Sequence, residues 1–311
     1  MASVKKTLSL VLVSMLFLSG FSPNFAVAAM TSTNYQILWD SVDAGGSNDS
    51  SSASYKLHDS IENIAGAGTS ASYSLKEGYR GGIYDRTVNF NVLSESRSYQ
   101  VGATLLSGTT VTVTTTSSYS VGSYIAIVQN EGVSQITAMG KVASLTATTM
   151  TVDALNTGGT TPTIDGVNDV VYLLSAVTAL DFGTLVTDAV STLIVGWEAS
   201  ADVSQGYNIY VMEDRDITAS GSSGNVLTDV SDGTVSPGAT EYGARSSDTS
   251  LASSTFDTAD TAITTTPQQV GSRGDNSLYT RDFLTLKASI ATGATSAMYT
   301  QALTVIFVGD Y

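Results

Sequence analysis

Hydrophobic and polar positions alternate most clearly near the end of the chain. In the stretch 283–290, apolar residues take every second position and polar ones the positions between: Leu284, Leu286, Ala288 and Ile290 against Thr285, Lys287 and Ser289. In the stretch 299–308, Leu303, Val305 and Phe307 share one face in the same way. A period of two is typical of an antiparallel strand with one buried face and one face in water. We therefore expect the polar set, including Lys287, to face solvent.

The region between residues 180 and 211 contains three more β-type runs. They are residues 180–185, 191–197 and 206–211, and polar or glycine-bearing connections separate them. Shorter strands are expected at 226–230 and 241–243. Together these runs predict an all-β fold, with an antiparallel β-sandwich over residues 179–311.

Residues 88–178 contain six short β-type runs joined by polar turns. The expected strands are Val88–Leu93, Thr109–Thr115, Tyr124–Gln129, Gly140–Ala147, Met150–Ala154 and Asp169–Leu174. This spacing is typical of a small β-barrel of the SH3 or OB type, or of half a sandwich. Alternatively, the region is inserted into the C-terminal sandwich, and residues 88–92 then pair with its strands.

Residues 30–87 carry a tyrosine-led repeat. The stretches 35–42, 55–61 and 73–79 each begin with Tyr, and linkers rich in Gly, Ser and Asn, such as residues 44–54, lie between them. We expect three short strands with too few apolar residues for a core of their own, because an isolated hairpin is marginally stable in water. They should therefore pack on the C-terminal domain or on a neighbouring molecule. The predicted contact residues are Tyr35, Ile37, Trp39, Tyr55, Leu57, Tyr73, Leu75 and Tyr79.

The first 29 residues are expected to be a secretory signal peptide. Lys5 and Lys6 precede the apolar run Leu8–Leu18, and Ala26-Val27-Ala28 forms a small-residue cleavage site. The run is too short to cross a bilayer. We expect a mature protein that is secreted to the bacterial cell surface, divided into residues 30–87, 88–178 and 179–311.

Charge and cysteine content narrow the functional classes. The chain has 28 Asp plus Glu against 13 Lys plus Arg, and no cysteine. A negative field of this size repels nucleic acid and anionic membranes, so neither is an expected partner. Without cysteine there are no disulfides, thiol nucleophiles or thiolate metal sites.

Several short motifs carry a resemblance to known surface proteins. They are Asn34-Tyr35-x-Ile37, the two copies of Ser-x-Ser-Tyr-x-Leu at 52–57 and 70–75, Leu-Asp-Phe-Gly-Thr-Leu at 180–185, Gly-Tyr-x-x-Tyr-Val at 206–211 and Glu-Tyr-Gly at 241–243. Over residues 31–85 and 179–311, the chain resembles β-sandwich proteins of the bacterial envelope, including pilus or fibre subunits and WxL-like wall-associated domains. It departs from them in lacking both a Trp-x-Leu motif and a Leu-Pro-x-Thr-Gly sorting signal. Covalent wall anchoring is therefore not expected.

Candidate chemistry is sparse. The single histidine, His58, is expected to be an exposed strand residue rather than a catalytic base. Two acid pairs in predicted loops could bind calcium weakly through carboxylate oxygens: Asp214 with Asp216, and Asp229 with Asp232. Arg273-Gly274-Asp275 is interpreted as a turn. Because Lys287 falls on the predicted solvent face, we do not expect it to form an amide cross-link.

These features favour a structural role over an enzymatic one. The leading hypothesis is a subunit of a surface fibre, pilus-like filament or surface layer, which polymerises head to tail by lending a strand to its neighbour. The alternative is a monomeric adhesin or carbohydrate-binding module that uses the loops at 212–280 to bind a surface glycan or host ligand. A glycoside hydrolase with an acid pair drawn from Glu198, Asp202, Glu213, Asp214 and Asp216 is a third hypothesis. No cofactor other than calcium is expected.

Overall fold

The computed structural model describes residues 46–51, 56–60, 68–69, 74–75, 88–177, 179–201, 205–220, 224–275 and 277–310. Every regular element in these ranges is a β-strand, which confirms the all-β class. The described part of the chain has no helix long and apolar enough to cross a membrane. The predicted signal peptide lies outside the described residues. The chain divides into two compact units, Met1–Gly82 and Ile83–Tyr311.

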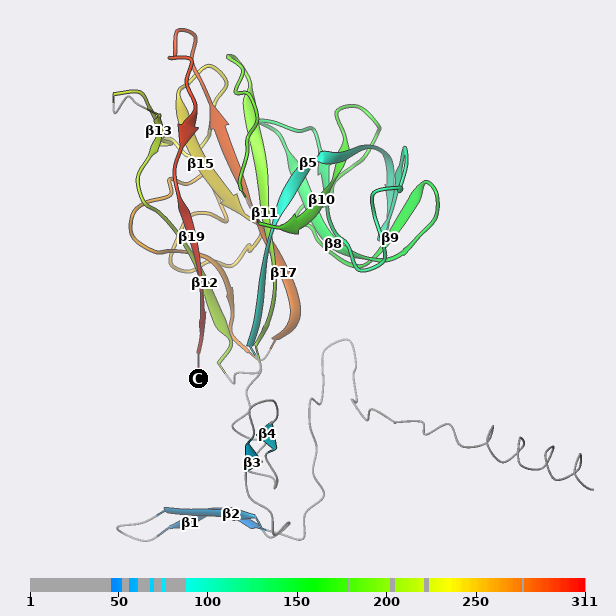
Figure 1. Ribbon diagram of the computed structural model, residues 1–311, viewed down its shortest axis with the longest axis vertical. Coiled ribbons are helices and arrows are strands. Elements are labelled where there is room, and N and C mark those ends of the chain that lie inside the picture. The colour runs from blue at the N-terminus through cyan, green and yellow to red at the C-terminus, as the bar shows by residue number, and fades with distance from the viewer. Residues whose placement is uncertain are drawn as a thin grey trace, which may run out of the picture. The chain divides into compact units, whose positions relative to one another are not determined.

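The first unit contains two short antiparallel pairs. Strand β1 (Gly46–Ser51) pairs with β2 (Lys56–Ser60), and β3 (Gly68–Thr69) pairs with β4 (Ser74–Leu75) (Figure 1). Residues 46–51 were expected to belong to a linker, and that prediction is wrong. Backbone groups supply the hydrogen bonds of a ladder, so a polar segment can pair without apolar side chains.

Two of the eight predicted contact residues lie in the described part of this unit. Leu57 lies in β2 and Leu75 lies in β4. The other six predicted contact residues are outside the described part of the chain: Tyr35, Ile37, Trp39, Tyr55, Tyr73 and Tyr79.

In the second unit, one long strand joins two regions. Strand β5 (Val88–Ser107) is 20 residues long. Its first part, residues 88–94, pairs with β11 (Val190–Ala201), which is the pairing that an inserted middle region predicts. Its later part pairs with β6 (Thr110–Val113) and with β10 (Val170–Ala176). Figure 1 shows β5 running beside β11 and then into the region of β8 to β10.

The strands after β5 pair in a closed sequence. The order is β5, β6, β9 (Thr149–Asn156), β8 (Ile136–Leu145), β7 (Tyr124–Gln129), β10 and back to β5. We call these strands the ring. Its interior is packed with fully buried aliphatic side chains, among them Val111, Ile125, Ile127, Met150 and Val171.

Beyond β11 the same large sheet continues through β17 (Ser277–Ser289), β15 (Glu241–Ser246), β14 (Val226–Asp229), β13 (Ile217–Ala219) and β18 (Tyr299–Thr300). A smaller sheet has the order β16 (Gln268–Arg273), β12 (Tyr207–Glu213), β19 (Leu303–Gly309). The main core lies between the two sheets and contains Trp197, Tyr207, Ile209, Leu284 and Leu286, each at most 3% exposed.

The predicted water-facing side of β17 is buried, so that prediction is wrong. Thr285 and Lys287 are each 7% exposed, and Ser289 is fully buried. The reason is that β17 has β11 on one side and β15 on the other, and further segments cover its second face. Lys287 is neutralised there by an ion pair with Asp260.

The predicted strand at 180–185 is also wrong, because this segment forms no regular element. The Asp181 carboxylate accepts the N–H of Gly183 at 2.7 Å, and Gly183 has a left-handed φ of +72°. Such a local turn breaks the extended conformation that a strand requires. Leu180, Phe182 and Leu185 instead pack against the main core from a loop.

Candidate functional site

One flank of the second unit ends in two strand edges. Strand β19 is the last strand of the smaller sheet and pairs with β12 alone. Residues 88–92 of β5 pair with β11 alone. Phe90 of β5 and Phe307 of β19 face each other, with ring centroids 5.1 Å apart. We call this region the open flank, since within the described residues neither edge has a second strand beside it.

Strand β19 lacks the usual protection of an edge strand. Its sequence, Leu-Thr-Val-Ile-Phe-Val-Gly, contains no charged residue and no proline, and its register with β12 shows no bulge. Natural edge strands are normally blunted by lysine, proline or a bulge, because their free N–H and C=O groups otherwise recruit another strand. Val308 is 42% exposed and Val88, at the start of β5, is 38% exposed. The edge of β19 therefore carries none of these protective features within its seven residues.

An apolar groove lies beside this flank. Its volume is about 760 Å³, and its walls are Val177, the loop at 179–187 and the segment at 290–303. A smaller cavity of about 70 Å³ between the sheets shares Val177, Leu180 and Leu303 with the groove. On one wall the Phe182 ring packs edge-on against Tyr242, with centroids 6.3 Å apart. The 180–185 motif thus lines a groove instead of forming a strand.

An acidic cluster lies at one end of β12, β13 and β14. Glu213, Asp216 and Asp229 each place a carboxylate oxygen within 4.8 Å of the others. Glu213 is only 3% exposed, and Gln301 Nε2 donates to its Oε2 at 3.1 Å. Burial, followed by the charges of Asp229 and Asp216, raises the pKa of Glu213 to about 8. Burial and the Asp216 charge also raise the pKa of Asp229.

The cluster contains two of the four predicted calcium ligands. Asp216 and Asp229 come together, and Asp229 Oδ1 is buried without a hydrogen bond. Asp214 instead accepts the N–H of Ala302 at 2.8 Å, and Asp232 accepts the N–H of Thr234 at 3.0 Å in its own turn. Glu213 was not among the predicted ligands. Period-two patterning could have found it, because Glu213 continues the inward face of Ile209 and Val211.

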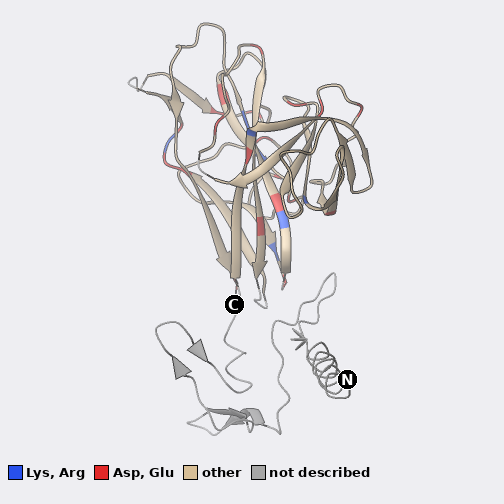
Figure 2. Ribbon diagram, turned by 45° about the vertical axis from the view of Figure 1, so that its right-hand side comes forward, with Lys and Arg blue, Asp and Glu red and all other residues tan. Residues whose placement is uncertain are grey.

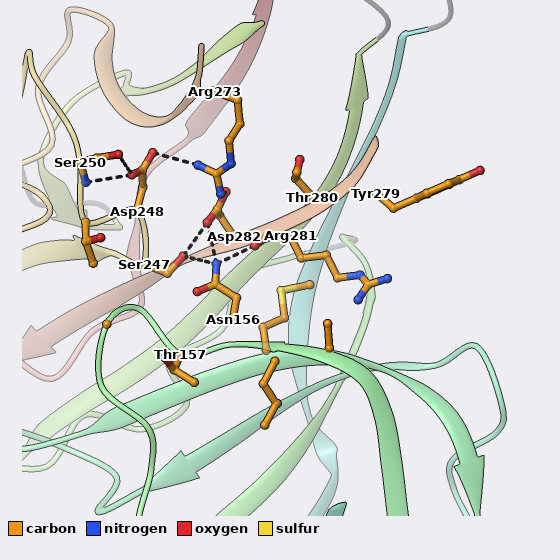
Figure 3. Close-up of a pocket in the computed structure, with 15 residues that line it drawn as sticks. Asn156, Thr157, Ser247, Asp248, Ser250, Arg273, Tyr279, Thr280, Arg281 and Asp282 are labelled. Atoms are coloured by element: carbon orange, nitrogen blue, oxygen red, sulfur yellow. Dashed lines mark hydrogen bonds and ion pairs between the residues drawn. The ribbon is translucent and has the colours of Figure 1, made fainter. Parts of the chain in front are cut away.

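A polar cleft of about 550 Å³ separates the end of β9 from β17 and the 247–250 loop (Figure 3). Inside it, Arg273 Nη2 lies 2.7 Å from Asp282 Oδ2, and Asn156 Nδ2 donates to Asp282 Oδ1 at 2.6 Å. Asp248 lies 3.4 Å from the Arg273 guanidinium. Burial raises the pKa of Asp282, although Arg273 opposes that shift. Figure 3 shows these side chains turned toward one another.

A second set of ion pairs fastens the ring to β11 and β17. Arg281 of β17 bonds both carboxylate oxygens of Asp153 at 2.7 Å and Glu198 Oε2 at 2.7 Å. Tyr124 donates to Glu198 Oε1 at 2.7 Å, and Lys141 lies 3.7 Å from the same oxygen. We call these five residues the clasp. Within it each charge has an opposite partner, so the clasp links the ring to β11 and β17 through charged contacts.

Other predicted candidates are placed as follows. The Arg273 side chain of the Arg-Gly-Asp tripeptide forms ion pairs with Asp282 and Asp248. Glu198 is engaged in the clasp, while Asp202 lies outside the described residues. His58 lies in β2. Figure 2 shows that most of the second unit is uncharged ribbon and that basic positions on the strands lie beside acidic ones.

Comparisons with protein-family models, curated proteins and solved structures found no match to this chain.

Proposed function

We propose that this chain is a secreted structural subunit that assembles head to tail into an extracellular fibre by strand complementation. In this proposal the two sheets around Trp197 act as a β-sandwich, and the ring acts as a small β-barrel rigidly fastened to it. The observation that carries the proposal is the unprotected edge of β19 beside an apolar groove. An added strand would bond to that edge and cover half-buried apolar side chains at the flank.

The donor we propose is the N-terminal repeat of another copy. In residues 35–39, Tyr35, Ile37 and Trp39 alternate with Gln36 and Leu38, so an extended strand would present the first three on one face. Each large apolar side chain that becomes fully buried contributes roughly 1.5–3 kcal/mol. Donor and acceptor are different surfaces of the same chain. A head-to-tail contact of this kind propagates as a filament unless the rotation between successive copies produces a closed cyclic oligomer.

The polar sites support a structural role. In the cleft and the clasp, the charged side chains are engaged with one another. Glu213 is 3% exposed and hydrogen-bonded to Gln301, so a substrate would have little access to its carboxylate. The same cluster offers oxygen ligands of the kind that calcium prefers, and we propose it as a weak stabilising calcium site.

A carbohydrate-binding module is the second candidate, and Tyr279 favours it. Tyr279 lines the polar cleft, is 54% exposed and has a left-handed φ of 55°. Strained, exposed aromatic residues occur at binding sites more often than elsewhere. However, Figure 3 shows the ring pointing away from the polar network. Binding to a glycan array that Tyr279→Ala removes would support this candidate.

Deletion of residues 30–85 tests the fibre proposal directly. The shortened protein should elute as a monomer in size-exclusion chromatography, because it keeps the acceptor flank and lacks the donor. It should also bind a synthetic peptide of residues 33–42, and bind a peptide carrying Ile37→Asp much more weakly. Polymers formed by the deletion variant would contradict the mechanism.

A further inference from the structure

A buried lysine and a buried aspartate meet on the covered face of β17. Lys287 is 7% exposed and Asp260 is 4% exposed. Lys287 Nζ lies 2.9 Å from Asp260 Oδ1 and 3.1 Å from Oδ2. Oδ1 is buried and accepts no hydrogen bond, in spite of its short distance to Nζ. The amine nitrogen therefore lies within 3.1 Å of both carboxylate oxygens, next to the carbon that an amide bond would join to it.

The surroundings hold the two groups in this position. Asp260 Oδ2 accepts the N–H of Val235 at 3.0 Å, and the N–H of Asp260 bonds to Gly233 O at 2.9 Å. The next residue, Thr261, exchanges two backbone hydrogen bonds with Ala244 of β15, at 2.8 and 2.9 Å. This bridge fixes the aspartate segment against the strand that neighbours Lys287.

The packing also excludes water. Gly243 pairs with Lys287 across the sheet, and a Cβ at Gly243 would lie 2.6 Å from Val230 Cγ1. Only glycine therefore lets the covering segment approach so closely. Val230 and Val235 of the covering segment form a small buried apolar cluster with Val190 of β11. The covering layer therefore keeps bulk water away from the Lys287–Asp260 pair.

We propose that Lys287 and Asp260 join in an intramolecular amide bond. The Nζ proton passes to the carboxyl group, and the neutral Nζ attacks Cγ of Asp260. The Cγ–Oδ1 bond then breaks, and Oδ1 leaves as water with two protons that Nζ held at the start. The Val235 N–H is placed to stabilise the negative charge that develops on Oδ2. The step needs no oxidant, reductant or co-reactant.

A second carboxyl group lies on the same face of the sheet. Glu241 is two residues from Gly243 on β15, and its Oε1 accepts the N–H of Ser236 at 2.6 Å. Ser236 directly follows Val235, which bonds to Asp260. Glu241 is therefore a positioning residue, which holds the turn that carries the Val235 N–H. The cross-link would tie β17 to the 260–263 segment, independently of any assembly into fibres.

Intact mass under denaturing conditions tests the bond in the full chain. The wild-type protein should be lighter than its sequence mass by one water molecule, and digestion should give a branched peptide joining the sequences around Lys287 and Asp260. Lys287→Arg and Asp260→Ala should both show their full sequence masses. Asp260→Asn should reach the mass of the cross-linked wild type, because it forms the same amide with loss of ammonia. Glu241→Ala, which removes the acceptor for the Ser236 N–H, should form the bond more slowly.

The wild-type protein alone is decisive if the variants fail to fold. A wild-type mass equal to the sequence mass, with the two peptides recovered separately, would overturn the proposal. A loss of water that persists in Lys287→Arg would also overturn it, because the dehydration would then lie elsewhere. Neither measurement depends on whether the protein forms fibres.

Discussion

The Phe307 ring of β19 lies between two aromatic neighbours, 5.1 Å from Phe90 of β5 and 5.0 Å from Tyr207 of β12. Tyr207 is fully buried, whereas Phe90 and Phe307 are partly exposed. The main core therefore extends to the open flank, where its aromatic side chains remain partly exposed. Aromatic packing already orders this edge, so the binding of a partner strand would cost little conformational entropy there.

The core between the sheets should be sensitive to loss of volume. Leu286 is 1% exposed, so Leu286→Ala should lower the free energy of unfolding by about 2–5 kcal/mol. Leu105 is 52% exposed, and Leu105→Ala is the matched control, expected to cost less than about 0.5 kcal/mol. Urea denaturation of the two variants measures the difference. Equal midpoints would show that Leu286 is not a core residue.

The clasp should contribute more to stability than a surface ion pair. Arg281→Met leaves Glu198 and Asp153 without their strongest partner, and breaking a largely buried pair costs roughly 3–5 kcal/mol. The control is Arg215→Met, because Arg215 is 61% exposed and lies 3.7 Å from Asp214. That exposed pair should contribute roughly 0–1 kcal/mol. If both variants melt at the wild-type temperature, the clasp does not fasten the ring.

Stability should fall as the pH rises through the range in which Glu213 titrates. The folded state holds the Glu213 proton up to a pKa of about 8, whereas the unfolded state releases it near the ordinary value of 4.5. Between these values the folded state binds more protons, so raising the pH favours unfolding. Burial raises the pKa of Glu95 to about 7, which acts in the same direction.

Glu213→Gln should flatten this pH dependence and raise the melting temperature above about pH 8, where the wild-type carboxyl group is charged. Part of the slope should remain in that variant because of Glu95. Melting curves at several pH values test both statements. An unchanged slope in Glu213→Gln would show that Glu213 does not titrate in this range.

Calcium should reverse the destabilisation above about pH 8, because the ion compensates the mutual repulsion of Glu213, Asp216 and Asp229. Calcium on the order of 1 mM, the range of weak extracellular sites, should raise the melting temperature, and a chelator should lower it. Asp229→Asn should remove the response, whereas the control Asp232→Asn should keep it. If calcium and chelator give the same melting curve in the wild type, the cluster is not a calcium site.

Several elements could be predicted from the sequence because local pattern determined them. The expected strand at 124–129 is β7, and its alternating Ile125 and Ile127 are both fully buried. The run at 191–197 lies within β11, and the run at 206–211 overlaps β12. In each case the β-type pattern is uninterrupted, and no turn signal competes with it.

Other features depend on what covers a strand, which local pattern does not contain. Residues 193–195 are apolar without alternation because β11 has the main core on one face and Leu93, Met139 and Phe283 on the other. Lys287 shows the converse case, since a polar residue in an alternating strand is buried by a distant segment that supplies Asp260. The acidic cluster required the ends of β12 and β14 to meet, and only the tertiary fold brings Glu213 and Asp229 together.

The most direct test of strand complementation is negative-stain electron microscopy of the mature protein and two single substitutions. Ile37→Asp places a charge on the donor face that Tyr35 and Trp39 share, while Gln36→Asp places the same charge on the opposite face. Filaments in the wild type and in Gln36→Asp, and their loss in Ile37→Asp, are the predicted result. A wild-type protein that stays monomeric at all concentrations, or filaments undiminished in Ile37→Asp, would contradict it.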